Sequence, residues 1–559
     1  MNPITTSALP DAALDAFAKA LGQSIALLYP GAESAVEFEA PRRPEFGDFA
    51  CNAAFSLAKT ARRSPNDVAL ALIDSVRTLA PDTAALFARI DAVAGFINLR
   101  LAPSVWQALL ARVLREGSSF GRSASNGQRI SLEFGSANPT GPLVVVQGRT
   151  LSIGDTLARA MRFCGYDVFV EWIINDAGNQ METLGRSLYL RYRQLFEPSI
   201  PFPEDGYPGV YLIPLAEGIA GRYGKRWVET EESEWLPVFA QVGRDAIVAE
   251  QRETAERFGV AYDHWQSEKE LRESGRMKED LTKLRDMGLI YDSEGAYYFR
   301  TSDFGDDKDR VIIKSDGSPT YFAPDIAYHF EKLSRADRVI DILGPDHHGY
   351  IGRLKAAAAA MGFPGRLDVL IAQQITLLRG GEQVSMSKRS GNIITLDEIL
   401  DEVGVDAARF FFAMLAPESP LTFDLKLAVE ASSENPVYYV QYGHARIASV
   451  LRNADSGDVS AAASNTNLAP LASAAELALV RRLAELPHVV EGAVRHLAPH
   501  RLAKYARDVA TDFHQFYTEC RVLVEDRDVR LARLSLCIAT KTVLAAGLDL
   551  LGVSAPESM

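Results

Sequence analysis

The proline- and glycine-rich run SANPTGP, residues 136–142, has the composition of a site that could hold a phosphate group. It follows RISLEF, a predicted strand, and precedes TLSIGDTLARAMRFCG, whose apolar residues recur at helical spacing. Where a strand meets a helix, backbone N–H groups and the helix dipole favour an anion. Asn-Pro and Gly-Pro are also common turn formers, so an ordinary tight turn stays open as the alternative.

A second candidate is the glycine-flanked basic segment GEQVSMSKRSGN, which contains Lys388 and Arg389. It follows the predicted strand LIAQQITLL. A cation on a flexible loop can close onto pyrophosphate as it forms and then open to release it. A solvated basic turn is the alternative interpretation.

Polar segments follow two other predicted strands. GPDHHGY comes after RVIDILG, and INDAGNQ comes after YDVFVEWII. The adjacent His347 and His348 do not indicate a metal site, because neighbours on an extended chain point to opposite faces. We expect the first segment to contact a nucleotide. The second segment is either a polar part of the site or, equally, a hydrogen-bonded turn and helix cap.

The elements that carry these segments follow the order strand, helix, strand twice, first from Arg129 and again from RVIDILG to DVLIAQQITLL. This order predicts an α/β, doubly wound parallel sheet over residues 125–420, with its site at the carboxyl ends of the strands. An insertion of about residues 180–320 splits the expected sheet. Residues 1–115 predict a small α+β domain, and the long helical patterns of residues 421–559 predict an all-α bundle.

Composition is that of a soluble globular protein of several domains, since 559 residues exceed what one core usually serves. Four widely spaced cysteines predict neither a zinc site nor a disulfide framework, which fits a reducing cytosol. The apolar stretch LSLCIATKTVLAAGLDLLGV is broken by Lys541 and Asp549, so we expect a packed helix and no membrane partner. The net charge of −14 argues weakly against a nucleic-acid partner, although a local basic face would suffice.

These motifs carry a family resemblance. LEFGSANPTGPLVVVQGR resembles the first class I signature of arginyl-tRNA synthetases, and GEQVSMSKRSGN resembles the second. The likeness covers almost the whole chain, including RPEFGDFACNAAFSLAK and AGFINLRL near the start and ENPVYYVQYGHARIASVL near the end. The resemblance implies a Rossmann-like catalytic domain between an N-terminal domain that contacts the tRNA body and a helical anticodon-binding domain.

The chain departs from the family at Val144, Val145, Val146 and Gln147, where the family has His, an aliphatic residue, Gly and His. In the family the imidazoles stabilise phosphate charge during adenylate formation, and the glycine admits adenine. Valine can do neither, whereas Gln147 keeps a neutral amide donor. Because losing one preorganised donor costs roughly a hundredfold to a thousandfold in rate, either other groups compensate or the role has changed.

The resemblance implies four sets of site residues. The catalytic set is Lys388, Gln147, Ser387 and Arg389. The ATP set is Ala137, Pro139, Thr140, Gly141, Pro142, Val144, Val146, Gly148, Gly344, Asp346, His347, Met386 and Lys388. The arginine set is Glu133, Ser136, Asn138, Tyr321, Asp325 and Gln373, and the tRNA set is Tyr438, Tyr442, Arg446 and Met559. Taken alone, each residue would be read as a surface, cap or core position.

The activity that the resemblance implies is the ATP-dependent attachment of L-arginine to tRNA(Arg) through an arginyl-adenylate. ATP would enter as its Mg²⁺ complex, without a metal bound by the protein, and the enzyme would be a cytoplasmic monomer. One alternative is a paralogue that binds tRNA but has lost amino-acid activation, and another is an enzyme that passes activated arginine to a different acceptor. Retention of Lys388 and of the arginine set favours the ligase.

Overall fold

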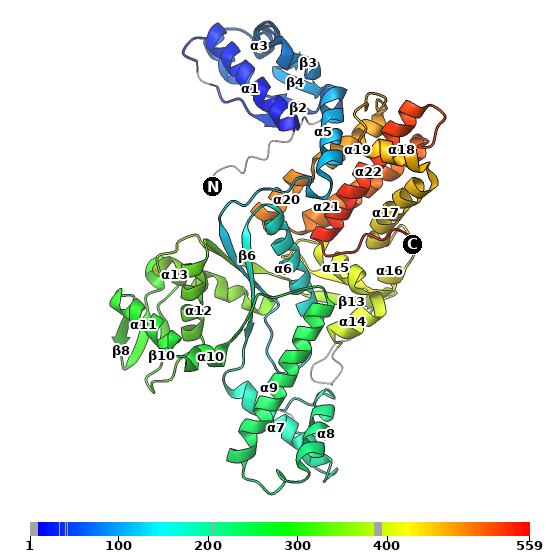
Figure 1. Cartoon of the computed structure of the whole chain (residues 1–559). Coiled ribbons are helices and arrows are strands. Elements are labelled where there is room, and N and C mark those ends of the chain that lie inside the picture. Colours follow the sequence, from blue (N-terminus) through cyan, green and yellow to red (C-terminus); the bar gives the residue numbers. More distant parts are fainter. Residues whose placement is uncertain (1–8, 33, 40, 42, 204–205, 385–393) are drawn as a thin grey trace.

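The structure is a computed structural model, and it describes residues 9–32, 34–39, 41, 43–203, 206–384 and 394–559. Figure 1 shows the chain passing from an N-terminal part in blue, through a central α/β part in cyan to yellow, to a helical bundle in orange and red. The N-terminal part lies beside one end of the bundle, joined to it by α5 (Pro103–Glu116).

The N-terminal part is α+β, as predicted. Its antiparallel sheet has the order β1-β2-β4-β3, with strands Phe38–Glu39, Phe49–Cys51, Phe96–Leu101 and Phe87–Val93. Its helices are α1 (Leu9–Leu28), α2 (Ala53–Ala61), α3 (Pro65–Leu79) and α4 (Pro81–Ala84). The Ser64 side chain accepts from the Asp67 N–H at 3.1 Å, which caps α3 where the pattern Ser-Pro-Asn-Asp predicts a start.

The central sheet has five parallel strands in the order β12-β11-β5-β6-β7. They span Leu367–Ile371, Arg338–Leu343, Arg129–Phe134, Asp167–Ile174 and His264–Ser267. Helix α6 (Val145–Phe163) connects β5 to β6, and α13 (Ile351–Ala360) connects β11 to β12. The strand order reverses between β5 and β11, so the predicted doubly wound fold is confirmed and its switch point lies at β5.

The expected insertion is two segments, because β7 of the parallel sheet lies inside it. Before β7 come α7 (Asn179–Gln194), α8 (Leu212–Tyr223) and α9 (Glu232–Arg257), which share an aromatic core. After β7 come α10 (Glu268–Glu273), α11 (Arg276–Asp286), the antiparallel β8 (Ile290–Ser293), β9 (Ala296–Phe299) and β10 (Arg310–Ile313), and α12 (Phe322–Arg335). The four residues of β7, HWQS, lack the apolar run that marks a buried strand.

A small sheet joins the central part to the bundle. It has the order β14-β13-β15, with strands Glu382–Gln383, Ile375–Arg379 and Leu421–Asp424. The predicted strand LIAQQITLL is therefore two strands, β12 and β13, interrupted at Gln373. Helices α14 (Leu396–Val403), α15 (Val405–Ala413) and α16 (Leu425–Val429) surround this sheet.

The bundle is all-α, as predicted. Its helices are α17 (Pro436–Asn453), α18 (Ser456–Ala463), α19 (Ala474–Ala484), α20 (Leu486–Arg495), α21 (His500–Glu519) and α22 (Arg527–Leu550). By length and composition, α22 could cross a membrane, but most of its apolar stretch is buried within the protein, against helices that include α17, α18 and α21. It is the packed helix that the sequence predicts.

Candidate nucleotide and amino-acid site

The predicted site segments meet at one edge of the central sheet. Residues 136–142 follow β5, Asn175 follows β6, Gly344 follows β11, and Gln373 follows β12. Because these strands are parallel, their carboxyl ends share one edge. The Asn175 amide donates to Oδ1 of Asn138 at 3.1 Å, so two of the segments touch directly.

The turn after β5 is held by hydrogen bonds from three sides. Ser136 Oγ donates to Glu133 Oε1 at 2.9 Å and accepts from the Ile173 N–H of β6 at 3.0 Å. The Gln251 side chain of α9 and the Tyr211 hydroxyl donate to backbone carbonyls of the turn. Burial raises the pKa of Tyr211 to about 12, so its hydroxyl remains a donor at neutral pH.

Gln147 caps the helix that follows the turn. Its Oε1 accepts from the Val144 N–H at 3.2 Å at the start of α6, where Val144 is extended. Nε2 of Gln147 has no hydrogen-bond partner in the described part of the chain, which leaves it available to a ligand. Val145 is buried, whereas Val144 and Val146 are half-buried.

The same corner meets the helix beyond the second signature. Val144 pairs with Thr395 in an antiparallel bridge, and the Leu396 N–H donates to the Leu143 carbonyl at 2.7 Å. Met386, Ser387, Lys388 and Arg389 lie outside the described residues. The first signature is therefore in contact with Thr395 and Leu396, which come shortly after the second signature in the chain.

Gly148, one of the residues predicted to bind ATP, is closely packed against neighbouring helices. It is buried, and a Cβ there would lie 2.6 Å from Leu396 Cδ1 and 2.9 Å from Phe412 Cε2. The close approach of α6 to α14 and α15 explains the glycine.

Arg149, which the sequence interpretation missed, is fully buried beside the site. It donates to the carbonyl oxygens of Gln373 (2.8 Å), Ala416 (3.0 Å) and Ser419 (2.8 Å), and burial lowers its pKa to about 10. The available signal was an arginine directly before the apolar helical pattern that begins at Thr150. Its contacts hold Gln373 in place at the end of β12.

Three carboxylates lie side by side on neighbouring strands of the sheet. Glu133 of β5 is in register with Asp341 of β11 on one side and Glu171 of β6 on the other. Like charges directly opposite one another destabilise a sheet. Lys332 of α12, which is wholly buried, compensates by placing Nζ 2.9 Å from Glu133 Oε2 and 2.5 Å from Asp341 Oδ1.

Other side chains of α12 complete this carboxylate ladder. Tyr328 and Arg335 both donate to Glu171, and His329 Nε2 lies 2.7 Å from Asp341 Oδ2. Burial acts to raise the pKa of Asp341, but Lys332 and His329 outweigh burial and hold the pKa below its usual range. Burial acts to lower the pKa of Lys332, but the surrounding carboxylates raise it.

The arginine set is thus divided between engaged and available groups. Each carboxylate oxygen of Glu133 already has a protein donor, and the side chain is only 5% exposed. Asp325 is half-buried, and only its Oδ2 has a partner among the described residues, the Tyr350 hydroxyl. Tyr321 is 78% exposed at the start of α12. Asp325 is therefore the freer of the two predicted carboxylate partners.

The segments after β11 and β6 differ in character. Asp346 and His347 are exposed in a 3-10 turn, Pro345–Tyr350, where a ligand could reach them. Asp176 is buried and accepts from Arg244 Nε at 3.0 Å and Ser267 Oγ at 2.9 Å. Asp176 of the INDAGNQ segment is therefore committed to a buried hydrogen-bond network.

Three of the four residues predicted to bind tRNA line one pocket of the bundle. Tyr442, Arg446 and Met559 line a cavity of about 320 Å³ together with Tyr517. The Tyr438 and Tyr442 rings stack with centroids 5.8 Å apart, and the Arg446 guanidinium carbon lies 4.6 Å from the Tyr442 ring centre. The pocket combines flat rings with a cation, which suits a nucleobase beside a phosphate.

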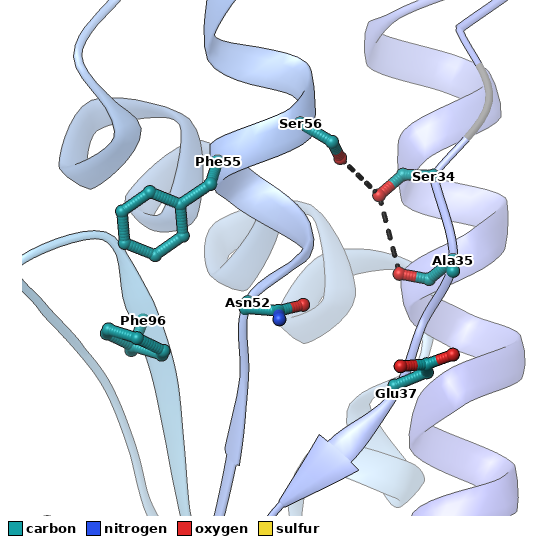
Figure 2. A pocket seen from close by; sticks show the side chains of 7 residues that line it. All are labelled: Ser34, Ala35, Glu37, Asn52, Phe55, Ser56 and Phe96. Atoms are coloured by element: carbon teal, nitrogen blue, oxygen red, sulfur yellow. Dashed lines mark hydrogen bonds between the residues drawn. The ribbon is translucent and has the colours of Figure 1, made fainter.

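A second pocket, of about 510 Å³, lies in the N-terminal part (Figure 2). Phe55 and Phe96 form one wall, with ring centroids 5.0 Å apart and an interplanar angle of 66°. The hydroxyls of Ser34 and Ser56 lie 2.7 Å apart on the opposite side, and Figure 2 shows the Asn52 side chain between the two walls. Aromatic and amide groups together can stack on and hydrogen-bond a base.

Comparisons with known proteins agree with this architecture. Residues 13–101 match the arginyl tRNA synthetase N terminal domain, residues 226–413 the class I (R) tRNA synthetase catalytic domain, and residues 440–559 the DALR anticodon binding domain. The arginine–tRNA ligase of Syntrophotalea carbinolica is 45% identical over 95% of this chain and 96% of its own length. That of Desulfosudis oleivorans is 45% identical over 94% and 95%.

Thermus thermophilus arginyl-tRNA synthetase has the same fold, with a TM-score of 0.72, 23% identity, and coverage of 98% of this chain and 100% of that one. The family models and the curated relatives extend the agreement from the fold to the sequence. The chain belongs to the arginyl-tRNA synthetase family.

Proposed function

We propose that this chain is an arginine–tRNA ligase. It joins L-arginine to ATP to form arginyl-adenylate and diphosphate, and it then passes the arginyl group to the terminal ribose of tRNA(Arg), releasing AMP. The observation that carries the proposal is the 45% identity to an arginine–tRNA ligase over 95% of the chain.

Arginine binding rests on groups that suit a planar five-donor guanidinium. Asp325 supplies a carboxylate with one oxygen available, and Asn138 and Gln373 supply amide groups at neighbouring strand ends. The exposed ring of Tyr321 offers a flat surface for the weakly hydrated face of the guanidinium. Glu133 supports Ser136 and is shared with Lys332.

ATP binding rests on the turn of residues 136–142 and on Lys388. The turn offers backbone donors at the amino end of α6, and Nε2 of Gln147 replaces the missing imidazole with a neutral donor. Lys388 supplies the positive charge that forming pyrophosphate requires. Mg²⁺ enters with ATP, because this ion usually binds through substrate phosphates.

The remaining parts read tRNA. The pocket of Tyr442 and Arg446 receives an anticodon base, and the N-terminal part contacts the tRNA body. We further propose that the enzyme is cytoplasmic, in keeping with its buried free cysteines, and that it acts as a monomer. A paralogue without activation gains no support, because the curated relatives named above are ligases.

Pyrophosphate exchange into ATP tests the proposal. Exchange should require arginine and rise strongly with cognate tRNA, as the family resemblance implies. Purified tRNA should then accept labelled arginine in preference to other amino acids. Tight tRNA binding with neither exchange nor charging would refute the ligase.

A further inference from the structure

The helical insertion between β6 and β7 reaches the turn that follows β5. Gln251 of α9 donates through Nε2 to the carbonyl oxygens of Asn138 at 3.1 Å and Gly141 at 2.9 Å. Tyr211, just before α8, donates its hydroxyl to the carbonyl oxygen of Thr140. Tyr211 and Gln251 thus anchor three carbonyl groups of one short turn, although they lie 71 to 113 residues further along the chain.

One of these three peptide groups carries an N–H. The peptides that begin at Asn138 and Gly141 end in proline, which has none. The Gly141 N–H belongs to the peptide whose carbonyl, that of Thr140, is held by Tyr211. In a planar trans peptide the C=O and N–H bonds point in opposite directions, so anchoring the Thr140 oxygen also fixes the direction of the Gly141 N–H. It has no hydrogen-bond partner among the residues that the structure describes.

Gln251 is committed to this turn. The residue is 1% exposed, and its Oε1 is buried without a hydrogen-bond partner in the described ranges. An unpaired buried acceptor costs stability, so the two donated bonds have to offset it. The same helix contacts the region beyond the second signature, because Thr254 and Arg257 both bind Asp397 of α14.

We propose that Tyr211 and Gln251 are positioning residues for arginine activation, because they hold the turn so that the Gly141 N–H faces the phosphate groups of ATP. The inference rests on the proposed function, in which this turn binds ATP. Neither side chain touches ATP; each acts through the backbone. A preorganised donor stabilises charge that develops in the transition state, so misalignment lowers kcat more than it weakens arginine binding.

Two substitutions test the kinetic consequence. Tyr211→Phe removes one hydroxyl, and Gln251→Met removes two donated bonds in a similar volume. At the usual net worth of one hydrogen bond, Tyr211→Phe lowers kcat of tRNA-saturated exchange about fivefold, and Gln251→Met lowers it by more than about tenfold. The KM for arginine stays within about twofold in Tyr211→Phe, because Tyr211 contacts none of the proposed guanidinium partners.

Tyr189→Phe is the matched control. Its hydroxyl donates to the Trp227 carbonyl at 3.0 Å inside the same insertion, away from the turn. The control should lose stability as Tyr211→Phe does but keep its kcat. Wild-type kcat in Tyr211→Phe would overturn the inference, and this variant decides alone if Gln251→Met does not fold.

A selective NMR label separates the inference from the proposed function. Thr140–Gly141 is the only Thr–Gly pair in the sequence, so carbonyl-¹³C threonine with ¹⁵N glycine selects one amide, that of Gly141. A non-hydrolysable ATP analogue with Mg²⁺ should shift this signal in the wild type and shift it much less in Tyr211→Phe. No shift in the wild type would refute ATP binding by the turn. Equal shifts in both proteins would overturn only the role of Tyr211.

Discussion

The ammonium group of Lys332 lies 2.9 Å from Oε2 of Glu133, and this ion pair ties α12 to the central strand β5. Lys332 also binds Asp341, so one buried cation serves two of three carboxylates that lie in register. Removing it leaves uncompensated charge in the sheet beneath the proposed arginine site.

Lys332→Met should therefore lower the free energy of unfolding by about 3 to 5 kcal/mol, as when one partner of a buried ion pair is lost. Urea denaturation at pH 7 measures the change. Lys269→Met is the control, because the Lys269–Glu273 pair is long, at 4.0 Å, and exposed, so its loss should cost less than about 1 kcal/mol. Equal midpoints for the two variants would contradict the role of Lys332.

The loss of stability caused by Lys332→Met should become smaller in acid. Lys332 and His329 hold the pKa of Asp341 below its usual 3.8, against burial. An acid with a depressed folded-state pKa stabilises the fold above its unfolded-state value and loses that contribution as pH falls through the folded-state value. The difference between wild type and variant should shrink as pH drops below 3.8. A difference that grows in acid would show that Asp341 is not the partner.

Asp325→Asn should weaken arginine binding by about 2 to 5 kcal/mol if its half-buried carboxylate pairs with the guanidinium. Burial raises the pKa of Asp325, against the Tyr350 hydroxyl, so wild-type affinity should fall with acidification at a pH above 3.8. Calorimetry over a pH series checks both effects. The variant should lack this pH dependence, and Asp316→Asn, in an exposed turn, should match the wild type.

Gln147→Glu separates the two roles of the side chain. A carboxylate still accepts from the Val144 N–H and suits the positive end of the helix, so the cap survives. The amide donor is lost, which should cost about 2 to 4 kcal/mol of transition-state stabilisation in exchange. Gln147→Ala should lose both, whereas Gln515→Ala, on the surface of α21, should lose neither. Wild-type exchange in Gln147→Glu would mean that Nε2 does not contact ATP.

Tyr442→Ala should weaken tRNA binding by about 1 to 3 kcal/mol, which is the usual worth of stacking one base on an aromatic ring. Its ring stacks on Tyr438 and lies under the Arg446 guanidinium, so the change opens the pocket. Filter binding measures the affinity, and the KM for arginine should not move. Phe304→Ala, an exposed aromatic outside the bundle, is the comparison. Equal tRNA affinity in both would remove this pocket from the anticodon site.

Phe55→Ala should raise the KM for tRNA while leaving arginine activation nearly intact, because its ring is 43% exposed in the N-terminal pocket. Leu70→Ala, 46% exposed on α3 of the same part, controls for a change of apolar surface. Charging assays with varied tRNA concentration distinguish them. A rise in the KM for tRNA in both variants would indicate general destabilisation of the N-terminal part.

Local pattern predicted the main strands and helices of this protein, although not β7. The alternation of strand and helix around residues 129–174 predicts the parallel sheet, and the turn SANPTGP predicts where its first strand ends. Parallel strands share one carboxyl edge, so the sequence also predicts that residues from four distant segments meet there.

Only the tertiary structure decided which of those residues are available to a ligand. Glu133 and Asp325 are both acidic in the sequence, yet Lys332 engages the first and leaves the second freer. Gly148 is closely packed against α14 and α15, and Gln147 caps α6 while its amide nitrogen has no partner among the described residues. These outcomes depend on side chains that meet only after α6, α9 and α12 dock on the sheet, and residue periodicity carries no information about such contacts.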